Sequence, residues 1–252
     1  MNIMFDSMGT QVQVHNETSN RLVTLLGALD NQGTTYAFTD YTQNITPQLS
    51  DTDVLVILTH YPETQPGYTP AIPAGTNFAF SSFDLSATTG IPNWVSNGGQ
   101  LLLISNHTTF TTYDSTLANA FGITIVPAGF EVQQTPFTPL VPLVLVNTQA
   151  LDWQLNNVEP LLTCGVAPGN GTVLYNFPPG TIDGSGNGYD PADYAFAVLF
   201  PYGTNGGNVL VAARSGIAGD AGTGWPAPGE VGNGSNLSFL LNCINYLGGT
   251  IT

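Results

Sequence analysis

Basic side chains are almost absent from this 252-residue sequence. It contains no lysine and only two arginines, Arg21 and Arg214, against 17 acidic residues, which gives a formal net charge of −15 at pH 7. Binding to nucleic acid depends on Lys and Arg to displace counterions from phosphates, and binding to anionic membranes depends on the same residues. The composition therefore argues against nucleic acid and against anionic membranes as partners.

Long apolar runs and cysteines are scarce as well. No apolar run reaches the about 18 residues that span a bilayer, and the Met1-Asn-Ile-Met-Phe start shows no signal peptide. A polar surface built from Thr, Asn, Ser, Gln and Gly is typical of secreted or surface proteins, so we expect an extracytoplasmic location. Cys164 and Cys243 stand in apolar segments, which favours buried free thiols over a disulfide.

The remaining composition indicates an ordinary globular core. Hydrophobic residues make up 42% and aromatic residues 10% of the chain, which excludes global disorder. A chain of this length buries roughly 75% of its unfolded surface. We predict a single domain over residues 1–252, with a β-rich insertion at approximately 126–194.

Strands and helices alternate in the first half of the chain. Continuous apolar strands are predicted at 2–6, 53–61 and 100–106, and a strand with polar alternation at 34–40. Helices are predicted at 17–33, at 83–99 with an interruption near Gly90-Ile91-Pro92, and at 115–122. Buried strands separated by helices indicate an α/β fold with a parallel sheet covered on both faces, and the strands at 2–6, 54–59 and 101–105 are expected to be neighbours.

The second half is richer in strand patterns. Strands are predicted at 123–129, 140–146, 171–177, 194–200 and 208–214, and a closing amphipathic helix at 235–249. Two long loops, 62–82 and 178–194, exceed the usual length of connections within a domain, and such loops are usually functional or disordered.

The order of five segments resembles the class I glutamine amidotransferase-like superfamily, in particular a poorly characterised branch of extracytoplasmic and transport-associated domains. These segments are "IMFDSMG", "DTDVLVIL", "IPNWVSNGGQLLLISNH", "LANAFGI" and "NLSFLLNCINYLGG", and together they cover about residues 1–125 and 195–249. The resemblance implies a flavodoxin-like or Rossmann-like three-layer sandwich with a mostly parallel central sheet and a β-rich second half.

The sequence departs from this family where its catalytic residue is expected. Amidotransferases carry a nucleophilic cysteine on a tight turn after the strand that here reads "QLLLIS", and a glutaminase needs that thiolate to form its thioester. This chain has Asn106 and His107 there, and neither cysteine lies near. The resemblance therefore implies the fold without the glutaminase activity.

Titratable residues end three of the predicted parallel strands. Asp6, His60 and His107 occupy these positions, and His15 follows the first strand. Ligands of open α/β sheets bind at the carboxyl ends of the strands, and His with carboxylate builds a metal site or an acid–base pair. We predict that Asp6, His60 and His107 share one crevice, roofed partly by the loop at 62–82; the alternative is that they cap the sheet and meet water.

Two further residues are candidate ligand contacts. Asn106 lies beside His107, and Arg214 ends the strand at 208–214. A guanidinium anchors a ligand carboxylate well, although a structural pair with a nearby acid such as Asp220 is the competing interpretation.

The segment "DGSGNGYDPADY" at 183–194 follows the start of a calcium loop. Asp183, Ser185 and Asn187 alternate as oxygen ligands, Gly188 stands at the sixth position, and Tyr189 would offer its carbonyl. Asp190 or Asp193 would supply the later carboxylate, because position 12 is Tyr194 rather than an acid. Clusters of Gly, Asp and Asn also form plain turns, so Ca²⁺ is a candidate cofactor rather than an established one.

Three functions remain open from the sequence. The first is a non-catalytic binding or assembly module that holds a glycan, a small molecule or a protein partner, with loop aromatics available for stacking on sugars (Tyr61, Tyr68, Phe78, Phe80, Trp225). The second is a metal-dependent hydrolase that uses Asp6, His60 and His107. The third is a structural surface protein with a lysine-free exterior.

Overall fold

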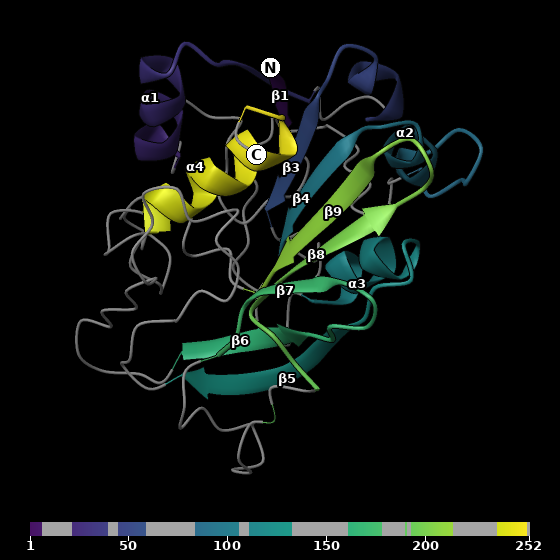
Figure 1. Cartoon of the computed structure of the whole chain (residues 1–252), viewed down its shortest axis with the longest axis vertical. Coiled ribbons are helices and arrows are strands. Elements are labelled where there is room, and N and C mark those ends of the chain that lie inside the picture. The colour runs from purple at the N-terminus through teal and green to yellow at the C-terminus, as the bar shows by residue number, and fades with distance from the viewer. Residues whose placement is uncertain are drawn as a thin grey trace, which may run out of the picture.

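The chain builds one large sheet and one small one. The computed structural model describes residues 1–6, 22–39, 45–58, 84–105, 111–132, 161–177, 190, 193–213 and 236–250. Seven strands form the large sheet in the order β2-β1-β3-β4-β9-β8-β7 (Figure 1). Their bounds are β1 Asn2–Phe5, β2 Thr35–Phe38, β3 Val54–Leu58, β4 Gln100–Ile104, β7 Thr172–Tyr175, β8 Ala197–Tyr202 and β9 Gly207–Ala212.

The core of this sheet is parallel. Every pairing from β2 across to β9 is parallel, and β9, β8 and β7 then pair antiparallel. The predicted neighbours β1, β3 and β4 lie side by side, so that prediction is confirmed. All five residues of β3 are buried, as their continuous apolar sequence predicts for a strand covered on both faces. The α/β fold class with a mostly parallel sheet is thus confirmed.

In the described part of the chain, four α-helices and one short 3₁₀ helix accompany the sheet. They are α1 Val23–Asn31, η1 Thr46–Leu49, α2 Ile91–Ser96, α3 Thr111–Asn119 and α4 Asn236–Leu247. The predicted interruption near Pro92 is where α2 begins, because proline lacks an N–H and fits only the first turn of a helix. Among the described residues, no helix is long and apolar enough to cross a membrane.

The helices cover both faces of the sheet (Figure 1). On one face, Tyr36 of β2 donates a hydrogen bond to Asp30 of α1 at 3.3 Å, and the Tyr175 ring of β7 packs edge-on against Phe239 of α4. On the other face, Gly207 of β9 lies so close to the Val95 carbonyl of α2 that an added Cβ would overlap it. A three-layer arrangement follows.

The second sheet is a separate antiparallel pair. It consists of β5 Ile125–Val132 and β6 Leu161–Val166, and a bridge from Val166 to Ala195 links it to the residues just before β8. The strand patterns at 123–129, 171–177, 194–200 and 208–214 correspond to β5, β7, β8 and β9, whereas β6 was not predicted. The pattern at 140–146 lies outside the described residues, and the single-domain organisation stays a prediction.

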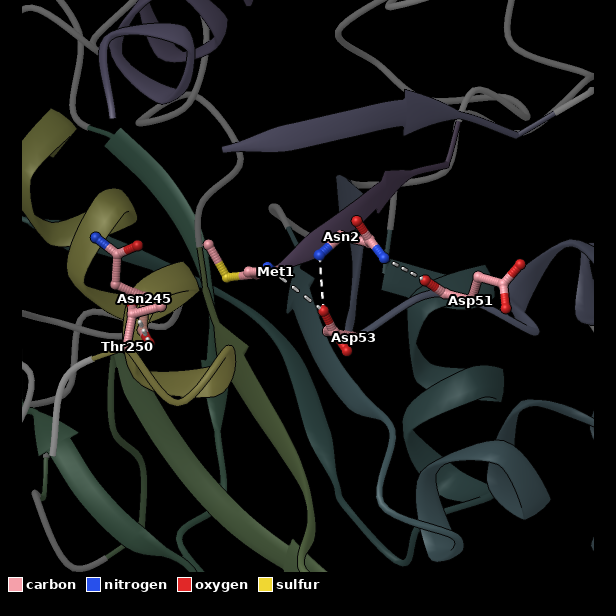
Figure 2. A network of polar contacts seen from close by, with 6 residues as sticks. All are labelled: Met1, Asn2, Asp51, Asp53, Asn245 and Thr250. Carbon is pink, nitrogen blue, oxygen red and sulfur yellow. Dashed lines mark hydrogen bonds and ion pairs between the residues drawn. The ribbon is translucent and has the colours of Figure 1, made fainter. Parts of the chain in front are cut away.

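Polar contacts fix the amino end of the sheet (Figure 2). The Asn2 main-chain N–H donates to Asp53 at 2.7 Å, and its side-chain amide donates to the Asp51 carbonyl at 3.0 Å. The Met1 amino group lies 3.8 Å from the Asp53 carboxylate. These contacts tie the start of β1 to the turn before β3, opposite the edge where ligands of such sheets bind.

Candidate functional site at the carboxyl edge of the sheet

Asp6 and Ser105 are two of the polar residues that directly follow parallel strands at the carboxyl edge. Asp6 follows β1 and its N–H donates to the Val56 carbonyl of β3 at 2.9 Å. Ser105 follows β4 and its N–H donates to the Ala212 carbonyl of β9 at 2.8 Å. Both residues therefore continue the ladder of their strand, which fixes where their side chains emerge.

Asp6 forms a buried pair with the next strand. Thr39 follows β2, and its hydroxyl donates to Asp6 Oδ1 at 3.3 Å. The two side chains are 2% and 3% exposed, respectively. The pair lies at the carboxyl end of two parallel neighbours, as the prediction that Asp6 belongs to this edge requires.

Ser105 and Asp114 form a second buried pair. The Ser105 hydroxyl donates to Asp114 Oδ2 at 2.8 Å, and neither side chain is exposed. Asp114 belongs to the first half of α3, so this bond joins the end of β4 to the helix that follows it. A hydrogen bond to a buried carboxylate is worth more than one between neutral groups, because the acceptor carries charge.

The thiol of Cys164 lies next to the pair of Ser105 and Asp114. Cys164 of β6 is fully buried, and its Sγ lies 3.3 Å from the Ala213 carbonyl to which it donates. Burial raises the pKa of the Cys164 thiol far above its usual range; a hydrogen bond with Ser105 offsets part of this rise and the neighbouring Asp114 carboxylate adds to it. The thiol is therefore protonated at neutral pH and is not a nucleophile.

The position of Cys164 corrects the expectation that neither cysteine lies near the end of β4. The residue is distant in sequence, but β6 carries it to Ser105 and Asp114. Cys243 of α4 is buried elsewhere, and burial likewise raises its thiol pKa. Both cysteines are free, as the sequence predicted.

Asp6 and Ser105, one member of each buried pair, lie on the same face of the sheet. The register Phe5–Val56–Leu102 places Asp6 in one row with Ile57 and Leu103. Ser105 is two residues beyond Leu103, and side chains of a strand alternate between faces, so Asp6 and Ser105 emerge on the same side. Only β3 separates their strands, and β3 leads toward residues 59 and 60.

Most of the predicted site residues lie outside the described part of the chain. This holds for the candidate ligand contacts His15, His60, Asn106, His107 and Arg214, and for the candidate calcium ligands Asp183, Ser185, Asn187 and Tyr189. The shared crevice of Asp6, His60 and His107 and the calcium loop therefore stay predictions. The loop at 62–82 lies outside the described residues too.

The two described calcium candidates stand in a turn. The Asp190 carbonyl accepts hydrogen bonds from the N–H groups of Asp193 and Tyr194, at 3.1 and 3.3 Å. Both Asp190 and Asp193 are exposed. Within the residues that the structure describes, no three His, Cys, Asp or Glu side chains gather as metal ligands.

Sequence reasoning missed Thr39, Asp114 and Cys164 as members of this edge. Thr39 is the last but one residue of the strand predicted at 34–40, and Asp114 directly precedes the helix predicted at 115–122, so both carried a local signal. Nothing local to Cys164 predicts its place, because its neighbours Ser105, Asp114 and Ala213 all come from other segments of the chain.

Comparison with solved structures adds to this geometry. No protein-family model and no curated protein matches the sequence. The mmIFT52 N-terminal domain is similar in structure, with a TM-score of 0.61 and 13% identity over 98% of this chain and 97% of that chain. Also similar are a glutamine amidotransferase from Thermotoga maritima (TM-score 0.49, 8% identity, 98% of both chains) and a putative GMP synthase subunit from Thermoplasma acidophilum (0.47, 11%, 99% of this chain and 96% of that chain).

The chain shares its fold with the mmIFT52 N-terminal domain. The α/β architecture with a mostly parallel sheet, which the resemblance noted from the sequence implies, is confirmed by the strand order and pairings. At identities of 8 to 13% the likeness concerns the fold alone, and the chemistry must be argued from the residues at the carboxyl edge.

Proposed function

We propose that this chain is a non-catalytic binding or assembly module of an extracytoplasmic or surface protein, and that its ligand occupies the carboxyl edge of the sheet. One observation carries the proposal. The residue that directly follows β4, where amidotransferases begin the turn that bears their nucleophile, is Ser105, and Ser105 is fully buried and donates to Asp114.

The neighbouring thiol does not replace that nucleophile. Cys164 lies beside Ser105 and Asp114, but it is fully buried and its raised pKa keeps it protonated. Glutamine hydrolysis requires an accessible thiolate. The group that would drive the family's reaction is thus inert in this chain.

The charge of the chain restricts the ligand class. A net charge of −15 disfavours anionic ligands, and Arg214 is the one arginine near this edge in the sequence pattern. Carboxylate and hydroxyl groups accept hydrogen bonds from a neutral polyhydroxylated ligand or bind a cation. Asp6 and Thr39 supply such groups at this edge, although both side chains are buried. A glycan or a cationic group on a partner fits this edge best, and Ca²⁺ bound by the loop at 183–194 would order its surroundings.

Thermal unfolding with defined probes tests the proposal. The melting temperature would be followed with chitohexaose, cellohexaose, a hexa-arginine peptide and Ca²⁺, for the natural chain and for Asp6→Asn. Ligands that bind only the folded state raise the melting temperature. We expect at least one probe to raise it in the natural chain and to lose that effect in Asp6→Asn. Asp51→Asn, an exposed acid at the opposite edge, is the matched control and keeps the response.

Two results would overturn the proposal. One is ammonia release from glutamine that Cys164→Ala abolishes. The other is zinc- or manganese-dependent hydrolysis of p-nitrophenyl acetate or p-nitrophenyl phosphate that Asp6→Asn abolishes, which would establish instead the metal-dependent hydrolase built on Asp6, His60 and His107. A failure of every probe in the natural chain would favour the third function, a structural surface protein.

A further inference from the structure

Acidic side chains far outnumber basic side chains in this chain. Seventeen acidic side chains stand against two arginines and three histidines. Acid unfolding of proteins has two main electrostatic causes. Carboxylates that are stabilised by cationic partners must give up that stabilisation when they are protonated, and the positive charges that remain repel one another.

The first cause is weak here because cationic partners are so few. Most of the acids have no basic side chain of their own to pair with. At pH 7 the dominant effect is mutual repulsion among carboxylates, which makes proton uptake easier in the compact folded state than in the expanded unfolded chain. The folded state then binds more protons than the unfolded state, and stability rises as the pH falls.

The second cause is limited by the missing lysines. Once the carboxylates are protonated, the two arginines and three histidines are the only charged side chains. Five positive charges distributed over a chain of 252 residues repel one another little. An ordinary domain, in which about a quarter of the residues are charged, accumulates far more.

Two buried acids have hydroxyl groups among their hydrogen-bond partners. The hydroxyl of Thr39 faces Asp6, and the hydroxyl of Ser105 and the thiol of Cys164 face Asp114. A serine or threonine hydroxyl both donates and accepts, so a hydroxyl–carboxyl hydrogen bond can form in either direction. An arginine guanidinium, in contrast, only donates hydrogen bonds and cannot accept one from a carboxyl group.

We propose that this charge pattern adapts the fold to an acidic medium: the chain keeps its folded state from pH 7 down to about pH 2.5, with a maximum of stability on the acidic side. The proposal is independent of the ligand at the carboxyl edge. It accounts for the absence of lysine and for a surface made of uncharged polar residues, neither of which the fold requires.

The experiment compares the natural chain with two matched variants. Both change the same five exposed positions, Thr35, Ser50, Asn119, Asn170 and Asn205, to lysine in one variant and to glutamine in the other. Melting temperatures would be measured between pH 7 and pH 2.5 at low ionic strength. Added lysines double the number of basic side chains that remain charged in acid, whereas glutamines of similar size add none.

We expect the natural chain and the glutamine variant to melt at pH 3 no lower than at pH 7. The lysine variant should match them or exceed them at pH 7, where lysines relieve the negative charge, and should melt lower by about 5 °C at pH 2.5. Salt should reduce that difference. A natural chain that loses its folded state between pH 5 and pH 3, or a lysine variant that tolerates acid equally well, would overturn the proposal.

Discussion

Ser105 donates a 2.8 Å hydrogen bond to Asp114, and both side chains are completely buried. The bond connects the residue that directly follows β4, a central strand, to α3. Because a carboxylate buried without donors is costly, the hydroxyl of Ser105 is worth more to the fold than its small size suggests.

Replacing Ser105 by alanine should therefore destabilise the protein. The variant leaves the Asp114 carboxylate without this donor, and we expect the free energy of unfolding in urea to fall by about 1–3 kcal/mol. Ser115→Ala, on the same helix but partly exposed, should change it by less than about 0.5 kcal/mol. A double-mutant cycle with Asp114→Asn would isolate the pair, and additive losses would argue that the two side chains do not interact.

Both thiols should be unreactive in the folded protein. Cys164 and Cys243 are fully buried, and burial raises the pKa of each above the range in which a free thiol ionises. At pH 8 we expect no colour with Ellman's reagent in buffer and two equivalents in 6 M urea. Rapid modification of Cys164 under folding conditions, with Cys164→Ala as the reference, would show that the carboxyl edge is open to thiol chemistry.

Two glycine substitutions should act in opposite directions. A Cβ at Gly207 would overlap the Val95 carbonyl of α2, so Gly207→Ala should cost on the order of 2 kcal/mol because strand and helix must separate. At Gly27, inside α1, a Cβ meets nothing within 4 Å, and Gly27→Ala should gain about 0.5–1 kcal/mol from helix propensity. Urea unfolding of both variants checks the packing of α2 against β9, and a stabilising Gly207→Ala would contradict it.

Calcium should stabilise the folded chain if the loop at 183–194 binds it. At a hundredfold excess over its dissociation constant, a ligand of the folded state contributes about 2.7 kcal/mol, which for a chain of this size raises the melting temperature by about 5 °C or more. The double variant Asp183→Ala/Asn187→Ala should lose the response, and Mg²⁺ should not reproduce it. Identical melting curves with Ca²⁺ and with EDTA would leave the loop a plain turn.

The strands of the sheet that are buried on both faces could be predicted from the sequence. The apolar runs of β3 and β4 have hydrophobic residues at successive positions, which a strand adopts only between two covering layers. Their parallel pairing followed from the helices between them. The short strand β6 was missed, because "LLTCGV" has no alternation and a strand of a two-stranded ribbon is selected by its partner rather than by its own pattern.

The carboxyl edge was predictable only in part. Asp6 could be placed there because a residue that ends a parallel strand reaches that edge whatever its neighbours are. The partners of Ser105 depend on tertiary packing: Asp114 comes from α3, and Cys164 arrives through β6 from a distant part of the sequence. Sequence position alone therefore gave Cys164 as an isolated apolar residue, which is correct for its burial and wrong for its location.

The position of β4 in the sheet has a consequence for how the chain acquires its structure. On one side β4 pairs with β3, and on the other with β9, whose residues follow more than a hundred positions later: Gln100 lies opposite Asn208. During synthesis, β1 to β4 are made first, and one edge of the apolar strand β4 stays unpaired until the end of β9 has been made. Folding should therefore be slow and late, and nascent chains cut before residue 207 should aggregate rather than fold.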